Sequence, residues 1–290
     1  MRIRLACLWR LAIVAVIITA LFNASSRLPV RSVGEPIKVS VGIPPLAYIV
    51  ERVGGPYVSV STLLISGQDP HTFEPSPRQV ASLAGADIYF SLDLPFEQRM
   101  LGKVQNQDSG LAIVSVAGIG REIHDEEHSH EDPHVWLSLK HLERMALEIA
   151  GTLTVRDTAH SAEYEQYLEK LCLEIQQLDA AIRQRLQPFA GREFLTYHSS
   201  LGHFAAEYGL IEVSIEVEGK SPGARALANI ITWAKSNGIR TVFVQPQFDD
   251  SSARLIAESI GASIVSIDPL KKDVLANLWA IADQLAQSME

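Results

Sequence analysis

Cysteine is scarce in this sequence and positive charge is not in excess, and each shortage excludes a class of protein. Two cysteines in 290 residues cannot form the disulfide framework of a small secreted module. The formal net charge is −9 and the isoelectric point is near 5.5, which argues against a basic surface for nucleic acid or anionic lipid. Hydrophobic residues make up 47% of the chain. We therefore expect a full core, in one large or two ordinary globular domains.

Long apolar runs are absent beyond the N-terminus. Three arginines precede a run of twelve apolar or neutral residues at 11–22, and small residues follow it. Such a run is short of the ~20 residues that a membrane helix needs, so residues 1–26 are typical of a cleavable secretory signal. An uncleaved N-terminal anchor is the alternative. Cys7 precedes the run instead of ending it, which predicts that the chain is not a lipoprotein.

After this leader, β-branched strands alternate with helices in two blocks separated by one long helix. The first block has predicted strands at 37–41, 58–65, 87–92 and 112–116, and the second at 194–197, 211–216, 241–244 and 262–267. This alternation predicts an α/β fold in which helices cover parallel sheets.

The long helix is predicted over 161–187, where apolar residues recur every three or four positions from Tyr164 to Leu186. Pro188 ends it. A coiled-coil dimer is the competing interpretation, but fewer than four heptads is short for one. A rigid connector along two lobes fits better. The predicted domains are a signal peptide at 1–26, an N-terminal lobe at 27–160, a linker helix at 161–187 and a C-terminal lobe at 188–290.

Candidate metal ligands lie at the ends of predicted strands. His71 follows the second strand in a proline-rich loop, His198 directly follows the strand at 194–197, and Asp268 follows the strand at 262–267. His134 precedes a helix that starts near residue 139. Because carboxyl ends of strands line the ligand crevice in open α/β sheets, two facing sheets would bring the four together. Three imidazoles and one carboxylate suit Zn²⁺ and, less well, Mn²⁺ or Fe²⁺.

Each of these residues also has a simpler explanation. A single histidine in a loop is more often not a ligand, and Asp268 before a proline can open a turn or cap a helix. His141 and His160 lie in helical stretches and are expected at the surface or in packing. His203 lies in a helical stretch too and is expected at the surface or in packing, with a weaker role as a reserve ligand.

Four motifs give this chain a family resemblance: HTFEPSP at 71–77, DPHVWLS at 132–138, TYHSSLGHFAAEYGL at 196–210 and IDPL at 267–270. They resemble the zinc/manganese-binding proteins of metal-uptake ABC transporters, a family that includes ZnuA and lipoproteins once called adhesins. The resemblance runs from residue 37 to about 290. It implies two (β/α)₄ lobes with parallel sheets, one long rigid helix between them and one metal in the interlobe cleft.

The resemblance also implies a function. Its ligands carry over to His71, His134, His198 and Asp268. The chain would then be a periplasmic monomer, not an enzyme, that captures a divalent cation and delivers it to an ABC permease in the inner membrane, with no nucleic-acid partner. Manganese-type members commonly carry glutamate at the third ligand position. A histidine there favours Zn²⁺ over Mn²⁺ or Fe²⁺.

Some features depart from the family or stay open. Leu139 stands where the family often has proline, and Ser199 stands where it usually has aspartate. The segment 124–131 holds three histidines and four acidic residues. It resembles a short form of the histidine-rich loop of zinc-type members, and a solvated acidic loop is an equal interpretation.

Three other functions remain as alternatives. One is a manganese- or iron-specific member of the same family, and another is a surface adhesin. The third is a zinc metallohydrolase, because catalytic zinc sites keep three protein ligands and an open water position. A general base beside the site would distinguish it. Glu74 and Asp132 are the nearest acidic residues in sequence.

Overall fold

The computed structural model describes residues 34–65, 67–104, 110–118, 132–216, 220–248 and 251–290. The predicted leader at 1–26 and the acidic, histidine-containing segment at 124–131 lie outside these ranges. Within them, no helix combines the length and the apolar character that crossing a membrane requires.

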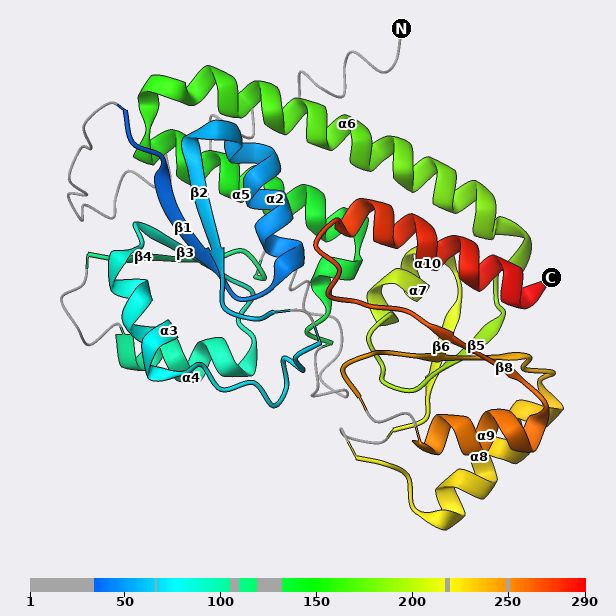
Figure 1. Ribbon diagram of the computed structural model, residues 1–290. Helices are drawn as coiled ribbons and strands as arrows, with labels where there is room; N and C mark the ends of the chain where they lie inside the picture. Colours follow the sequence, from blue (N-terminus) through cyan, green and yellow to red (C-terminus); the bar gives the residue numbers. More distant parts are fainter. Residues whose placement is uncertain (1–33, 66, 105–109, 119–131, 217–219, 249–250) are drawn as a thin grey trace, which may run out of the picture.

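The first lobe is a four-stranded parallel sheet with helices on both faces. Its strands are ordered β2-β1-β3-β4, and β1 pairs with β2 and β3 in parallel register. In Figure 1, α2 and α5 lie on the face toward α6, and α3 and α4 lie on the other. The strands are β1 (Ile37–Val41), β2 (Val58–Thr62), β3 (Ile88–Ser91) and β4 (Ala112–Ser115), and the helices are α2 (Pro44–Gly54), α3 (Pro77–Ser82), α4 (Pro95–Val104) and α5 (Leu139–Arg156).

The second lobe repeats this architecture. Its parallel sheet has the order β6-β5-β7-β8, which is the same crossover pattern as in the first sheet. The predicted fold class is therefore confirmed. The strands are β5 (Glu193–Thr196), β6 (Ile211–Ser214), β7 (Thr241–Val244) and β8 (Ser263–Ser266), and the helices are α7 (Gly202–Tyr208), α8 (Ala224–Ser236), α9 (Ser251–Ile260) and α10 (Val274–Met289).

The predicted connector is α6 (Ser161–Leu186), a helix of 26 residues that runs past both lobes in Figure 1. It packs against α2 and α5 of the first lobe and against α10 of the second. Its apolar stripe is buried at Tyr164, Leu171, Ile175, Ile182 and Leu186, as the three-to-four spacing predicts. Short 3₁₀ helices complete the fold: η1 (Gly55–Tyr57), η2 (Leu83–Gly85), η3 (Val135–Leu137), η4 (Thr158–His160) and η5 (Gln187–Phe189).

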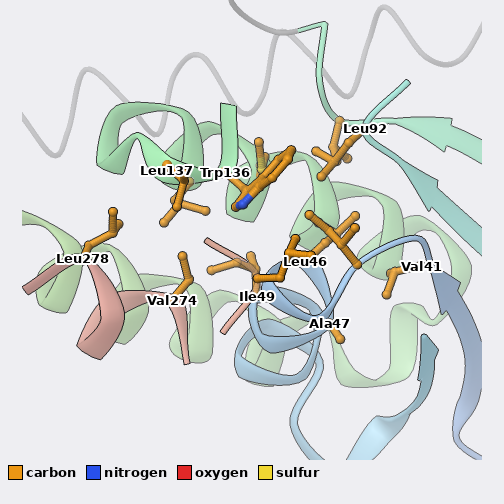
Figure 2. Close-up of a cluster of buried hydrophobic side chains, with 14 of the residues drawn as sticks. Val41, Leu46, Ala47, Ile49, Leu92, Trp136, Leu137, Val274 and Leu278 are labelled. Carbon is orange, nitrogen blue, oxygen red and sulfur yellow. The ribbon is translucent and has the colours of Figure 1, made fainter. Parts of the chain in front are cut away.

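One apolar core extends from the first lobe into the second. Figure 2 shows Trp136 and Leu137 of η3 near Leu46 of α2, with Val274 and Leu278 of α10 in the same cluster. The Trp136 indole N–H also donates to the carbonyl of Pro269 at 2.9 Å. Because these buried groups belong to both lobes, rotating one lobe against the other would break close packing. The shared core therefore holds the two lobes in a nearly fixed relative position.

Candidate metal centre

Three imidazoles meet where the two lobes face each other. The Nε2 atoms of His71 and His198 lie 3.1 Å apart, and those of His198 and His134 lie 3.3 Å apart. One ring nitrogen from each of the three lies within 4.8 Å of the others. Zn–N bonds of 2.0–2.1 Å at tetrahedral angles would separate ligand nitrogens by about 3.3 Å. The two Nε2–Nε2 separations from His198 thus match those of a tetrahedral zinc site.

His134 is held in place by the aspartate two residues before it. Asp132 Oδ1 accepts from the His134 backbone N–H at 3.0 Å and lies 2.6 Å from Nδ1. Burial opposes ionisation of Asp132, but the bonds from His134 outweigh it and lower the pKa of this carboxyl below its usual value. A carboxylate on Nδ1 fixes the tautomer that presents the Nε2 lone pair. His134 is 4% exposed, so its ring has little freedom to turn away.

His198 has the same kind of support from the second lobe. It lies two residues after the end of β5, and its Nδ1 lies 2.5 Å from Oε1 of Glu216, which lies two residues after the end of β6. The backbone of His198 is fixed by Gln245, whose amide accepts from its N–H at 3.2 Å and donates to its carbonyl at 2.8 Å. His198 and Glu216 are both buried. The sequence analysis missed Glu216, although its position after a strand neighbouring β5 is the same signal that marked the ligands.

His71 comes from the loop between β2 and α3 and is the most exposed of the three. Asp69 accepts from its backbone N–H at 2.9 Å and from the Thr72 hydroxyl. The adjacent Phe73 is buried and packs edge-to-face on Phe96 at 5.1 Å. Burial, and then the two neighbouring imidazoles, lower the pKa of His71. The ring therefore favours the neutral form that binds a metal.

Asp268, the fourth predicted ligand, is engaged differently. Its Oδ1 accepts from the Gln247 side chain at 2.6 Å and from the Leu270 backbone N–H at 3.0 Å. Among the described residues, the group of converging ligand atoms contains the three histidines and not this carboxylate. The structure therefore brings three of the four predicted residues together and holds the fourth through Gln247.

The other histidines have structural partners. His203 Nε2 bonds to the carbonyl of Asp132 at 2.9 Å, outside the three-histidine group. His141 bonds to the Ser138 hydroxyl at 2.7 Å, and burial lowers its pKa to about 4. His160 stacks on Tyr57 with ring centroids 3.9 Å apart. These contacts agree with the packing roles expected for His141 and His160.

A small cavity lies against the three imidazoles. Its volume is about 10 Å³, and Trp136, Gln247 and Phe248 also line it. A cavity of this size holds about one water molecule. In the described part of the chain no carboxylate lines the cavity. Of the two acidic residues considered as general bases, Asp132 is bound to His134 and Glu74 is exposed. The three imidazoles can thus coordinate a borderline-soft divalent cation.

Comparison with known proteins agrees with this geometry. Residues 39–287 match the ZnuA family, described as "Zinc-uptake complex component A periplasmic". The high-affinity zinc uptake system protein ZnuA of Bacillus subtilis is 26% identical over 271 residues, which cover 88% of this chain and 85% of that protein.

Solved structures show the same fold. A crystal structure of ZnuA superposes with a TM-score of 0.84 at 36% identity, covering 88% of this chain and 100% of that one. The laminin-binding protein Lmb of Streptococcus agalactiae, titled a bifunctional adhesin and metal transporter, superposes with a TM-score of 0.77 at 23% identity, covering 88% of this chain and 100% of its own. This second likeness concerns the fold alone.

Proposed function

Because the chain belongs to the ZnuA family of periplasmic zinc-uptake components, we propose that it captures Zn²⁺ outside the cytoplasmic membrane and delivers it to an ABC permease. The observation that carries this proposal is the convergence of three imidazole nitrogens at the spacing of a tetrahedral zinc site. The relative from Bacillus subtilis, named as a high-affinity zinc uptake protein, supports it.

We assign the metal to Nε2 of His71, His134 and His198. A set rich in imidazole favours Zn²⁺, whereas Mn²⁺ prefers sites with more carboxylate oxygen. The carboxylates of Asp132 and Glu216 on the opposite ring nitrogens strengthen the case, because ligating histidines usually carry such partners. Asp268, which the sequence predicts as a fourth direct ligand, is left out of this assignment because its carboxylate is engaged by Gln247.

The proposal makes the protein a carrier and not an enzyme. A carrier needs a site that binds and releases one ion, and among the described residues no carboxylate lines the cavity to activate a water molecule. We further propose a monomer that works in the periplasm without a lipid anchor, after removal of residues 1–26. Its domains are an N-terminal lobe at 27–160, a linker helix at 161–187 and a C-terminal lobe at 188–290.

Metal titration of the chain lacking residues 1–26 tests this function. Zinc affinity, measured by competition with a chromophoric chelator, should fall by orders of magnitude when the three ligand histidines are replaced by alanine. His160→Ala is the matched control, since that ring stacks on Tyr57 away from the site, and it should leave zinc affinity unchanged. Manganese should bind far more weakly than zinc. Unchanged zinc affinity in the triple variant, or a preference for manganese, would overturn the proposal.

A further inference from the structure

The side-chain amide of Gln247 is bound at one end and free at the other. Its Nε2 donates to Asp268 Oδ1 at 2.6 Å. Its Oε1 is buried and has no hydrogen-bond partner within the described part of the molecule. Oδ1 of Asp268 accepts this bond and one from the Leu270 backbone N–H, so it holds the nitrogen of the amide and leaves the amide oxygen turned away from it.

A buried carbonyl oxygen without a partner costs free energy, and most such groups in folded proteins are paired. Gln245, two residues earlier in the same loop, illustrates the usual state: its amide oxygen and nitrogen both bond to the backbone of His198. The amide oxygen of Gln245 has a partner, so the unpaired amide oxygen of Gln247 needs an explanation.

The location of Gln247 supplies a partner for that oxygen. Gln247 lines the cavity that the three imidazoles also line, and the cavity has room for about one water molecule. Three imidazoles fill three of the four tetrahedral positions around Zn²⁺ and leave the fourth for a non-protein ligand. A water molecule bound to zinc is polarised and becomes a strong hydrogen-bond donor.

We propose that Gln247 is a positioning residue whose Oε1 accepts a hydrogen bond from the water molecule at the fourth coordination position of the bound zinc, with Asp268 aligning its amide. This inference rests on the proposed function. Direct coordination by the amide fits less well, because carbonyl oxygens suit harder cations such as Ca²⁺ and Mn²⁺. Asp268 then acts on the metal through Gln247 and not as a ligand.

A double-mutant cycle separates this arrangement from direct ligation by Asp268. Gln247→Leu removes the acceptor, and Asp268→Asn offers an amide donor that lets Gln247 turn its nitrogen toward the cavity. Each change should weaken zinc binding about tenfold, in the range found for partners of ligands. The double variant should be no weaker than either single one, because both remove the same hydrogen bond. Gln287→Leu is the matched control: this glutamine also donates to an aspartate, Asp283, but on the surface of α10, and it should change nothing.

Cobalt substitution supplies a readout that a purely structural role would not change. The visible absorption bands of the Co²⁺ form should shift in Gln247→Leu and Asp268→Asn but not in Gln287→Leu. Thermal unfolding of the metal-free variants checks the fold, and Gln247→Met, of similar length, is the second variant if Gln247→Leu fails to fold.

Two results would overturn the inference. One is unchanged zinc affinity in Gln247→Leu or Gln247→Met. The other is a further loss of tenfold or more when Asp268→Asn is added to Gln247→Leu, which would identify Asp268 as a direct ligand. Neither result bears on the proposed function, which is tested separately by the three-histidine variant and by the preference for zinc over manganese.

Discussion

The buried carboxyl of Glu97 should make the stability of the first lobe depend on pH. Glu97 lies in the first turn of α4 and is 0% exposed. Its Oε2 accepts from the backbone N–H groups of Leu92 and Leu94 at 2.9 and 3.0 Å and from the Ser91 hydroxyl at 3.1 Å, and its Oε1 accepts from the Tyr89 hydroxyl at 2.8 Å. Burial outweighs these bonds and raises the pKa of Glu97 to about 7.

The direction of the effect follows from proton counting. The unfolded chain has a pKa of 4.5 at this residue, so between that value and about 7 the folded state binds more protons than the unfolded state. The stabilising contribution is therefore fully present below pH 4.5 and is lost as pH rises through the folded pKa. Between pH 5 and pH 8 this linkage lowers the free energy of unfolding by roughly 2–3 kcal/mol.

Glu97→Gln isolates this contribution, because glutamine keeps the shape of the neutral acid but does not titrate. Urea unfolding of the metal-free wild type and of the variant at pH 5, 6, 7 and 8 measures the difference. Metal must be removed, since zinc binding adds its own pH dependence to the folded state. The wild type should lose roughly 2–3 kcal/mol relative to Glu97→Gln over this range. Glu258→Gln, at an exposed position of α9, is the control and should track the wild type. The reasoning would be refuted if the difference in free energy of unfolding between the wild type and Glu97→Gln stayed constant from pH 5 to pH 8.

Three further outcomes are expected at the metal site. Gly202→Ala would place a methyl group 2.7 Å from Asp132 Oδ2 and so disturb the aspartate that supports His134; zinc affinity, measured by chelator competition, should fall up to about tenfold. Gly151→Ala in α5, with open space around it, is the control and should not change zinc affinity. Equal zinc affinities in the two variants would contradict the close contact at Gly202. Deleting residues 124–131 should leave the tight site intact in the same titration, and a large loss would make a histidine of that segment a primary ligand. Zinc affinity should fall as pH drops from 7.5 to 5 with a limiting slope approaching about three protons per metal, and a slope clearly below two would exclude three histidine ligands.

The order of elements was predictable because it depends on local patterns. Strand–helix alternation and the three-to-four spacing over 161–187 are visible in single segments, and the structure has the corresponding sheets and the helix α6. Strand ends were less accurate: β2 ends at Thr62 and not at residue 65. The N–H groups of Leu63 and Leu64 still bond to the carbonyls of Val41, the last residue of β1, and of Gly42, so the chain continues alongside β1 past the end of β2.

The meeting of His71, His134 and His198 follows from their positions at strand and loop ends, which the rule for parallel sheets brings to one crevice. The partners of these residues could not be predicted in the same way. A linear sequence does not show in which direction a side chain points. It therefore cannot show that Glu216 contacts the ring of His198, or that Asp268 faces the amide of Gln247 and not a metal. The packing of α10 against the first lobe likewise depends on tertiary contacts far apart in the chain.

The central claim is that three imidazoles hold the zinc ion. X-ray absorption spectroscopy of the zinc-loaded chain lacking residues 1–26 counts them directly, because imidazole rings give characteristic outer-shell scattering. We expect three imidazole nitrogens at 2.0–2.1 Å, with one oxygen donor completing the shell. Each single variant that still binds zinc should show one imidazole fewer; these variants are His71→Ala, His134→Ala and His198→Ala. A wild-type spectrum with fewer than three imidazoles, or with a sulfur ligand, would contradict the account.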